Sequence, residues 1–221
     1  AAKLAVVGEM AAAMSHEVRT PLGIMRSSAD VLLREPNLSK DGREVLGFII
    51  SETERLNKLV STLIDAARPR TPNFAPIDLT QLIYRVMALL QSQAQAKQIS
   101  ITFTETEVMT VWADQDQMTQ VLMNLLMNAI QILPPQGKVI LRLEKLENNM
   151  VLTVSDNGPG IRVSDQAQVF EPFFTQRAGG VGLGLAVVRQ IVHSHRGEIT
   201  YRNSVMGGAE FTMVLPVSES N

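Results

Sequence analysis

The sequence contains no cysteine and few aromatic residues, and what is scarce excludes several classes of protein. Without cysteine, the 221-residue chain forms neither disulfides nor thiolate metal sites, which fits a reducing compartment. A formal net charge of -2 provides no basic field for nucleic acid. The apolar runs are far shorter than the ~20 residues that span a bilayer, and no signal segment opens the chain. We therefore expect a cytoplasmic location, no nucleic-acid partner and no membrane contact within this chain.

The rest of the composition is that of a folded protein, with 45% hydrophobic and 19% charged residues. The opening residues, AAKLAVVGEMAAAM, have the pattern of a helix interior. We therefore expect the chain to be part of a longer protein, whose other segments decide any anchoring to a membrane.

Two long helices are predicted first. Apolar residues at spacings of three and four form a seam on each helix: Leu4, Val7, Ala11, Met14, Val18, Leu22, Met25, Ala29 and Leu32, and then Leu46, Ile49, Thr53, Leu56, Val60, Leu63 and Ala67. The segment 35–42 between them carries Pro36 and Gly42, which predicts an antiparallel hairpin. Two helices alone bury little surface, so we expect two hairpins to pair into a dimeric four-helix bundle. A hairpin that packs on the rest of its own chain is the alternative.

A proline-rich segment follows the hairpin. The nine residues 68–76, RPRTPNFAP, contain three prolines and predict a stiff, non-helical linker. We therefore place a helical-hairpin domain at 1–68, a linker at 69–76 and a second domain at 77–217. In the second domain, helices predicted after Asp78, after Asp114 or Asp116, and from Leu183 lie among strands of alternating hydrophobicity, which indicates an α+β two-layer sandwich.

His16, in the run MSHEVRTPLG, is a candidate nucleophile. At 100° per residue it is rotated roughly 200° from Met14 on the seam, so we expect it to be exposed. Most lone helical histidines are structural, but an exposed imidazole is largely an unprotonated nucleophile at neutral pH. Pro21 is expected to bend the helix at this place, and packing alone gives no reason for such a bend.

Three neighbours of His16 suit phosphoryl chemistry. Glu17 can accept a proton from the ring, and Arg19 provides a cation for an incoming phosphate. Thr20 lies one turn after His16 and can orient a water molecule near the same atom. The predicted catalytic group is therefore His16, Glu17, Arg19 and Thr20.

Two asparagines, Asn124 and Asn128, share one face of the helix predicted before Pro134, opposite a leucine-rich side. Asparagine is a mediocre helix former, so the presence of two asparagines on one helix face requires an explanation. Its carboxamide oxygen is a hard ligand that suits Mg²⁺ bridging the phosphates of ATP. A buried asparagine that binds the backbone is the structural alternative.

The segment 156–160, DNGPG, directly follows a predicted strand. A plain turn is the simplest interpretation, but no strand follows that would complete a hairpin. Asp156 at the strand end can accept a hydrogen bond from an adenine amino group. Gly158 and Gly160 would let the base approach the backbone closely.

A second glycine-rich segment, 179–185, opens a predicted helix and suits phosphate binding through backbone N–H groups. No strand precedes it, so the context excludes a Rossmann fold or a P-loop. Between the two glycine segments, phenylalanines at 170, 173 and 174 are expected to anchor a mobile segment that Arg177 fastens to phosphate.

In their order and spacing, these motifs resemble the sequence boxes of two-component sensor histidine kinases. The five boxes are the phosphoacceptor H box at His16–Pro21, the N box at Asn124–Ala129, the first glycine box at Asp156–Gly160, the F box at Phe170–Phe174 and the second glycine box at Gly180–Gly184. The resemblance covers nearly the whole chain. It implies a dimerising hairpin followed by a Bergerat-type ATP-binding sandwich, autophosphorylation of His16, and transfer to an aspartate of a response regulator receiver domain.

The resemblance also implies roles for single residues, with ATP and Mg²⁺ as cofactors. Asp156 would read adenine, Asn128 would hold Mg²⁺ and Asn124 would lie near the phosphates. The other residues expected to contact nucleotide are Gly158, Gly160, Phe174, Arg177, Gly180, Gly182, Leu183 and Gly184. The run FFTQRAGGVGLGLAVV is most similar to sensor kinases of the nitrogen-regulation type.

Three residues depart from the family's pattern: Val181 where threonine is common, Arg177 where lysine is common, and Arg196 in place of the first glycine of the usual H-G-G. We expect Arg196 to lie in a turn. His193 and His195 have no carboxylate at ligand spacing, and we expect them to be surface or helix-end residues.

Two rival functions remain. An ATP hydrolase of the same superfamily would carry a glutamate base at the position of Asn124, which cannot deprotonate water. A dimeric module that binds nucleotide without catalysis is the second rival. Dephosphorylation of the response regulator, with Glu17 and Thr20 positioning water, is compatible with the kinase function.

Overall fold

The computed structural model describes residues 2–67, 70–176 and 182–217, and the chain divides into two units, 1–70 and 71–221. In the first unit the description of side chains covers residues 18–57, 60, 61 and 70. Among the described helices, none has both the length and the apolar character needed to cross a bilayer.

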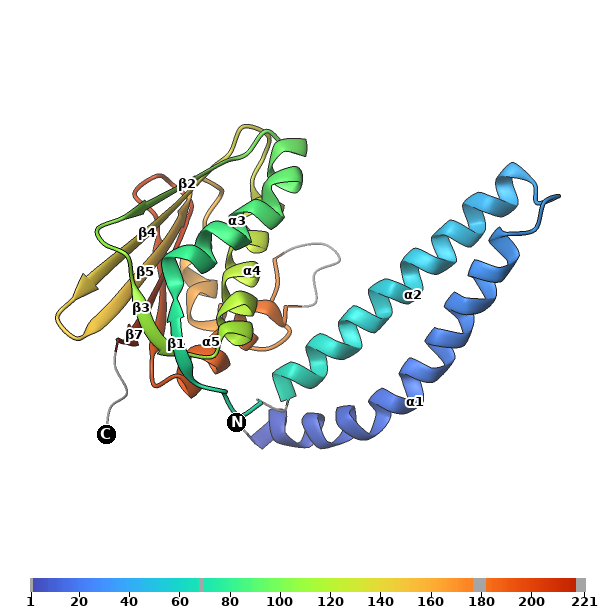
Figure 1. Cartoon of the computed structure of the whole chain (residues 1–221), viewed down its shortest axis with the longest axis horizontal. Coiled ribbons are helices and arrows are strands. Elements are labelled where there is room, and N and C mark those ends of the chain that lie inside the picture. The colour runs from blue at the N-terminus through green and yellow to red at the C-terminus, as the bar shows by residue number, and fades with distance from the viewer. Residues whose placement is uncertain (1, 68–69, 177–181, 218–221) are drawn as a thin grey trace. The chain divides into compact units, whose positions relative to one another are not determined.

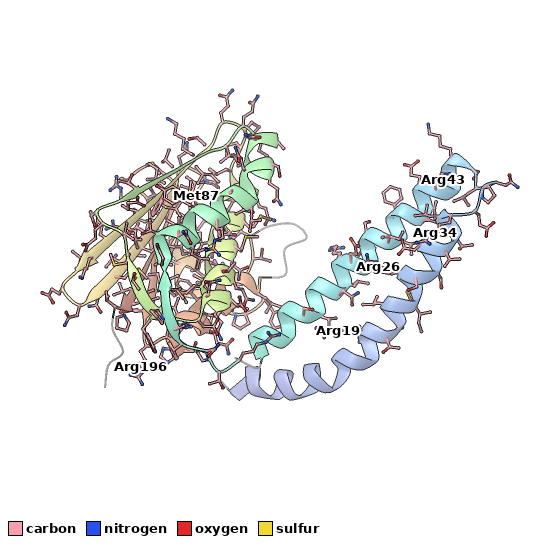
Figure 2. All side chains as sticks on the ribbon, in the orientation of Figure 1. Arg19, Arg26, Arg34, Arg43, Met87 and Arg196 are labelled. Carbon is pink, nitrogen blue, oxygen red and sulfur yellow. The ribbon has the colours of Figure 1, made fainter. Side chains whose placement is uncertain are left out.

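The first unit is an antiparallel helical hairpin of α1 (Ala2–Leu33) and α2 (Lys40–Ala67) (Figure 1). Helix α1 continues through Pro21 and is bent along its length (Figure 1). An interior proline is expected to bend a helix. Arg43 lies beside the turn between the helices (Figure 2) and donates to the carbonyl oxygens of Leu33 and Glu35 at 3.1 and 3.3 Å. The bond to Leu33 satisfies a carbonyl group that the end of α1 leaves without a helical partner, and the bond to Glu35 ties the turn to α2.

The second unit is a sandwich of a five-stranded sheet and helices on one of its faces (Figure 1). The order in the sheet is β2-β4-β5-β7-β6; β2 and β4 are parallel and the other pairs antiparallel. Its strands are β2 (Ser100–Glu105), β4 (Lys138–Leu146), β5 (Asn149–Asp156), β6 (Glu198–Asn203) and β7 (Ala209–Pro216), and the helices are α3 (Leu79–Ala96), α4 (Gln115–Ile132), α5 (Gly184–Ser194) and the 3-10 helix η1 (Val163–Gln168).

The alternation of buried residues along β5 shows which face of the sheet Asp156 points to. Met150, Leu152 and Val154 are at most 3% exposed and point to the helix-covered face. Asp156 comes two residues after Val154, so it points to the same face at the end of the strand. A carboxylate therefore lies between the sheet and the helices.

The prediction of a helical hairpin followed by a mixed α/β sandwich is confirmed, but one strand was missed. Strand β1 (Ala75–Asp78) pairs antiparallel with β3 (Thr110–Ala113), with Pro76 opposite Trp112. Ala75 and Pro76, which we assigned to the linker 69–76, belong to this small sheet instead. Proline is tolerated in an edge strand, and so the density of prolines concealed the strand.

Candidate active site

Asp156 is the buried centre of the site, with 4% of its surface exposed. Its Oδ1 accepts hydrogen bonds from the backbone N–H of Gly158 at 2.8 Å and of Ala209 at 3.1 Å. Burial raises the pKa of Asp156, and these two bonds oppose the rise. Among the described residues none donates to Oδ2, which leaves this oxygen as the acceptor for a ligand.

The turn between β6 and β7 presses against Asp156, a contact that the sequence motifs did not indicate. A Cβ atom at Gly208 would lie 2.1 Å from Asp156 Oδ1 and 2.4 Å from Gly158 N, so only glycine fits there. Gly160 has a φ of +65°, and a Cβ on it would lie 3.2 Å from Asn203 Oδ1. The predicted role of Gly158 and Gly160, to let the base approach the backbone closely, stays a prediction; in the structure the turn of Gly207 and Gly208 packs against Gly160.

Helix α4 brings the two asparagines to the same region. Asn124 Nδ2 donates to the carbonyl oxygen of Gly184, the first residue of α5, at 3.3 Å. Asn128 lies one turn further on and is half-buried, and its side chain has no hydrogen-bond partner among the described residues. Its carboxamide is therefore available to a ligand.

The start of α5 is suited to binding an anion. Leu183 is buried and occupies the N-cap position without a side-chain hydrogen bond to the helix. The first backbone N–H groups of a helix have no helical acceptors and carry the positive end of its dipole. A phosphate bound there would satisfy them.

Residues 170–174, which carry the phenylalanines, are hydrogen-bonded through their backbone to Gly182 of the second glycine-rich segment. Phe173 has a φ of 67°, rare for a large residue, and donates its N–H to the carbonyl oxygen of Gly182 at 2.9 Å. Gly182 has a φ of +69°, and a Cβ on it would lie 2.5 Å from the carbonyl oxygen of Phe174. Glycine is therefore required at this crossing. Arg177, Gly180 and Val181 lie outside the described residues, so their assigned roles stay predictions.

The hairpin carries the other predicted group. His16 and Glu17 lie within α1, and their side chains fall outside the description. Arg19 is exposed and donates through Nη2 to Ser61 Oγ of α2 at 2.9 Å. Thr20 is exposed as well. The expected exposure of the His16 ring therefore stays a prediction.

His195 lies at the C-cap of α5, as a helix-end residue, but our alternative of a surface position is wrong for it. It is only 3% exposed; Nε2 accepts from the Asp114 N–H at 3.0 Å and Nδ1 faces the Ile191 carbonyl oxygen at 2.8 Å. Burial lowers the pKa of His195. The ring also meets Phe74 edge-on at 5.0 Å. These contacts span segments far apart in the sequence, so no local pattern indicated them.

Arg196 follows with a φ of 57° in the turn before β6, which confirms the turn expected there.

Two family models match the chain. Residues 6–72 match the His Kinase A (phospho-acceptor) domain, and residues 113–219 match the histidine kinase-, DNA gyrase B- and HSP90-like ATPase. The signal transduction histidine-protein kinase AtoS of Escherichia coli K12 is 33% identical over 220 residues, which are 99% of this chain and 36% of AtoS. The sensor histidine kinase ZraS of Salmonella typhi is 34% identical over 97% of this chain and 47% of its own length. The chain thus spans less than half the length of these relatives.

Solved structures show the same likeness. Full-length ShkA in complex with AMPPNP matches with a TM-score of 0.86 and 27% identity over 96% of this chain and 46% of ShkA. ThkA in complex with the response regulator protein TrrA matches with a TM-score of 0.70 and 28% identity over 98% of this chain and 63% of that chain. The catalytic domain of ThkA matches with a TM-score of 0.62 and 31% identity over 66% of this chain and 96% of that domain.

A phosphoacceptor hairpin joined to an ATP-binding sandwich defines the class of protein histidine kinases. The chain belongs to the two-component sensor histidine kinases and comprises their catalytic core. The resemblance inferred from the five sequence boxes is confirmed, whereas the nitrogen-regulation subgroup stays a prediction.

Proposed function

We propose that this chain transfers the γ-phosphoryl group of ATP to His16 and then to an aspartate of a response regulator. The observation that carries the proposal is that α4 lies against both other parts of the site: Asn124 donates to Gly184 at the uncapped start of α5, and Ile132 and Leu133 lie beside Gly158, two residues after Asp156. The complex of the relative ThkA with the response regulator TrrA supports a receiver domain as the second substrate.

In the proposed complex, Asp156 Oδ2 accepts a hydrogen bond from the adenine amino group. The first N–H groups of α5 face the phosphates, near Asn124. His16 Nε2 attacks the γ-phosphorus in line, the bond from that phosphorus to the β–γ bridging oxygen breaks, and ADP leaves. Glu17 takes the Nδ1 proton of the imidazole. In the second step, a carboxylate oxygen of the regulator attacks the phosphorus and His16 is released.

Mg²⁺ fits the residues that are present. Among the described residues no cluster of three or more histidine, aspartate and glutamate side chains can hold a metal ion by itself. Mg²⁺ commonly binds through one or two protein oxygens together with substrate phosphates and water. The Asn128 carboxamide has no other partner among the described side chains and is our candidate ligand. Bound there with ATP, the ion would neutralise charge on the phosphates.

A homodimer is part of the proposal, and the seam of the hairpin supports it. Within 22–32 and 46–56 of the described residues, every second seam position is buried: Leu22, Ala29, Leu46 and Thr53 are at most 8% exposed. The positions between them are uncovered: Met25, Leu32, Ile49 and Leu56 are 39 to 52% exposed. A second hairpin that packs on these positions would complete a four-helix bundle.

The direct test is incubation with γ-labelled ATP, followed by measurement of the acid lability of the protein-bound label. His16→Gln is expected to abolish acid-labile labelling and to leave ADP binding within about twofold, because the imidazole lies outside the nucleotide-binding unit. His193→Gln, which changes an exposed histidine of α5, is the matched control and should be labelled normally.

Three results would overturn the assignment. Acid-labile phosphate on His16→Gln would exclude this residue as the acceptor. Free phosphate released without labelled protein would favour an ATP hydrolase. Normal ADP binding with neither label nor phosphate release would favour a non-catalytic module. Faster dephosphorylation of the labelled regulator in the presence of the chain would add the phosphatase activity expected from Glu17 and Thr20.

A further inference from the structure

The backbone beside the first glycine segment, 156–160, is hydrogen-bonded to a tyrosine that lies outside the sequence motif. The backbone N–H of Ile161, directly after Gly160, donates to the hydroxyl oxygen of Tyr201 on β6 at 2.9 Å. The same hydroxyl donates to Asn203 Oδ1 at 2.5 Å. A phenol that accepts from one group and donates to another is held in a single orientation.

The location of Tyr201 connects this hydrogen bond to Asp156. Tyr201 is paired with Phe211 and Asn203 with Ala209 in the β6–β7 register, so both side chains lie on the helix-covered face of the sheet. The Tyr201 ring packs on Phe211 at 5.3 Å between centroids. The backbone N–H of Ala209, opposite Asn203, is one of the two donors to Asp156 Oδ1.

The backbone of Gly160 is thereby held between two parts of the same hairpin. On one side lie the Tyr201 hydroxyl and Asn203, and on the other the turn of Gly207 and Gly208, whose carbonyl oxygens lie 3.4 and 3.3 Å from a Cβ built on Gly160. Gly208 also touches Asp156. A shift of the Gly160–Ile161 backbone would therefore change the distance between the glycine segment and the carboxylate.

We propose that Tyr201 is a positioning residue for nucleotide binding, which acts by fixing the Gly160–Ile161 backbone against the Asp156 carboxylate. The inference rests on the proposed nucleotide site. In this role Tyr201 acts only on the backbone of the proposed nucleotide site, so it governs nucleotide affinity and not the rate of phosphoryl transfer at saturating ATP.

The electrostatics of Tyr201 support its proximity to the site. Burial raises the pKa of the Tyr201 phenol, and the negative charge of Asp156 raises it further. The Asp156 carboxylate is thus close enough to affect the ionisation of Tyr201.

The test is Tyr201→Phe in the full chain, which removes one oxygen and keeps the ring on Phe211. Loss of the acceptor leaves the Ile161 N–H unpaired, and we expect the Kd for ADP to rise about five- to tenfold. The KM for ATP should rise by the same factor, with the rate at saturating ATP within about twofold of wild type. Tyr84→Phe is the matched control, because the only other tyrosine lies 51% exposed on α3 with its hydroxyl 3.4 Å from Glu105.

Two further measurements test the contacts of Tyr201 with Asn203 and with Asp156. Asn203→Ala removes the second partner of the hydroxyl, and its effect on the Kd should be less than additive with that of Tyr201→Phe. Tyr84→Phe also leaves Tyr201 as the single tyrosine, so its ionisation can be followed by ultraviolet absorbance. Asp156→Asn in this background removes a negative charge, and the apparent pKa of Tyr201 should fall.

Failure of the inference is distinguishable from failure of the proposed function. Wild-type protein that does not bind ADP would remove the nucleotide site itself. Wild-type binding with an unchanged Kd in Tyr201→Phe, or a variant that loses only the saturated rate, would overturn the role of Tyr201 alone. A lowered thermal midpoint with an unchanged Kd would assign the hydroxyl to folding and not to positioning.

Discussion

At the scale of single residues, the proposed contact of Asp156 with adenine would come at a cost in stability. A buried carboxylate with a raised pKa favours its neutral form, yet an adenine amino group requires an acceptor. Two backbone donors on Oδ1 hold the side chain in place while Oδ2 stays available. Replacement of the charge by a neutral group of the same shape should therefore affect stability and affinity in opposite directions.

Asp156→Asn is expected to raise the Kd for ADP by about tenfold or more, because an amide donor replaces the acceptor at the adenine amino group. The free energy of unfolding at neutral pH should stay equal or rise. Because the folded pKa of Asp156 lies above 3.8, protonation of Asp156 stabilises the folded state as pH falls from that raised pKa toward 3.8. The stability advantage of Asp156→Asn should therefore shrink on acidification, as measured by urea unfolding between neutral and acidic pH. An unchanged Kd would remove the adenine role.

His195 gives a pH prediction of the opposite sign. Its folded pKa lies below 6.5, so the unfolded chain binds more protons between the two values. The free energy of unfolding should be fully retained above about pH 6.5 and should fall as pH drops below it. His195→Gln should flatten this slope in chemical unfolding, whereas His193→Gln, at an exposed position of the same helix, should not. Equal slopes in all three proteins would contradict the prediction.

At the scale of elements, the sequence predicts features that depend on neighbouring residues, such as helix caps, and misses those that depend on distant ones. Asp78 and Asp114 cap α3 and α4 as expected, with side chains that accept from the N–H groups of Gln81 and Gln117. Strand β1 was missed because its four residues include a proline and gain their structure from pairing with β3. The contact of the β6–β7 turn with Asp156 was missed for a similar reason: a glycine pair between two strands already has a sufficient explanation as a hairpin turn.

The hairpin surface gives a prediction at this scale. Leu56→Glu places a charge on the uncovered half of the seam of α2, and we expect the dimer to dissociate with a Kd at least about tenfold higher. Leu146→Glu is the matched control, because Leu146 is a leucine of comparable exposure, 56%, at the end of β4. Sedimentation equilibrium measures both. A monomeric wild type, or a Leu56→Glu protein that dimerises normally, would remove the proposed bundle.

At the scale of the whole molecule, the connection between the units is shorter than the proline pattern indicated. The backbone N–H of Asn73 donates to Asp114 Oδ2 at 2.8 Å, and Phe74 packs on His195, so the end of the expected linker is bound to the second unit. We propose that the hinge lies within residues 70–72, the described part of the expected linker before Asn73. The five residues between Ala67, the last of α2, and Asn73 would span at most about 20 Å when extended.

A tether of this length limits how far the nucleotide site can move from His16, and its length should affect the transfer step alone. Insertion of Gly-Gly-Ser-Gly between Arg70 and Thr71 should lower the autophosphorylation rate at saturating ATP by about two- to threefold, because effective concentration falls as roughly the −3/2 power of tether length. The Kd for ADP should not change, since nothing in the second unit is altered. The same insertion between Asn148 and Asn149, at the β4–β5 turn, lengthens the chain without lengthening the tether and should leave the rate unchanged. If the rate is insensitive to both insertions, the movement of the units is not limited by this connection.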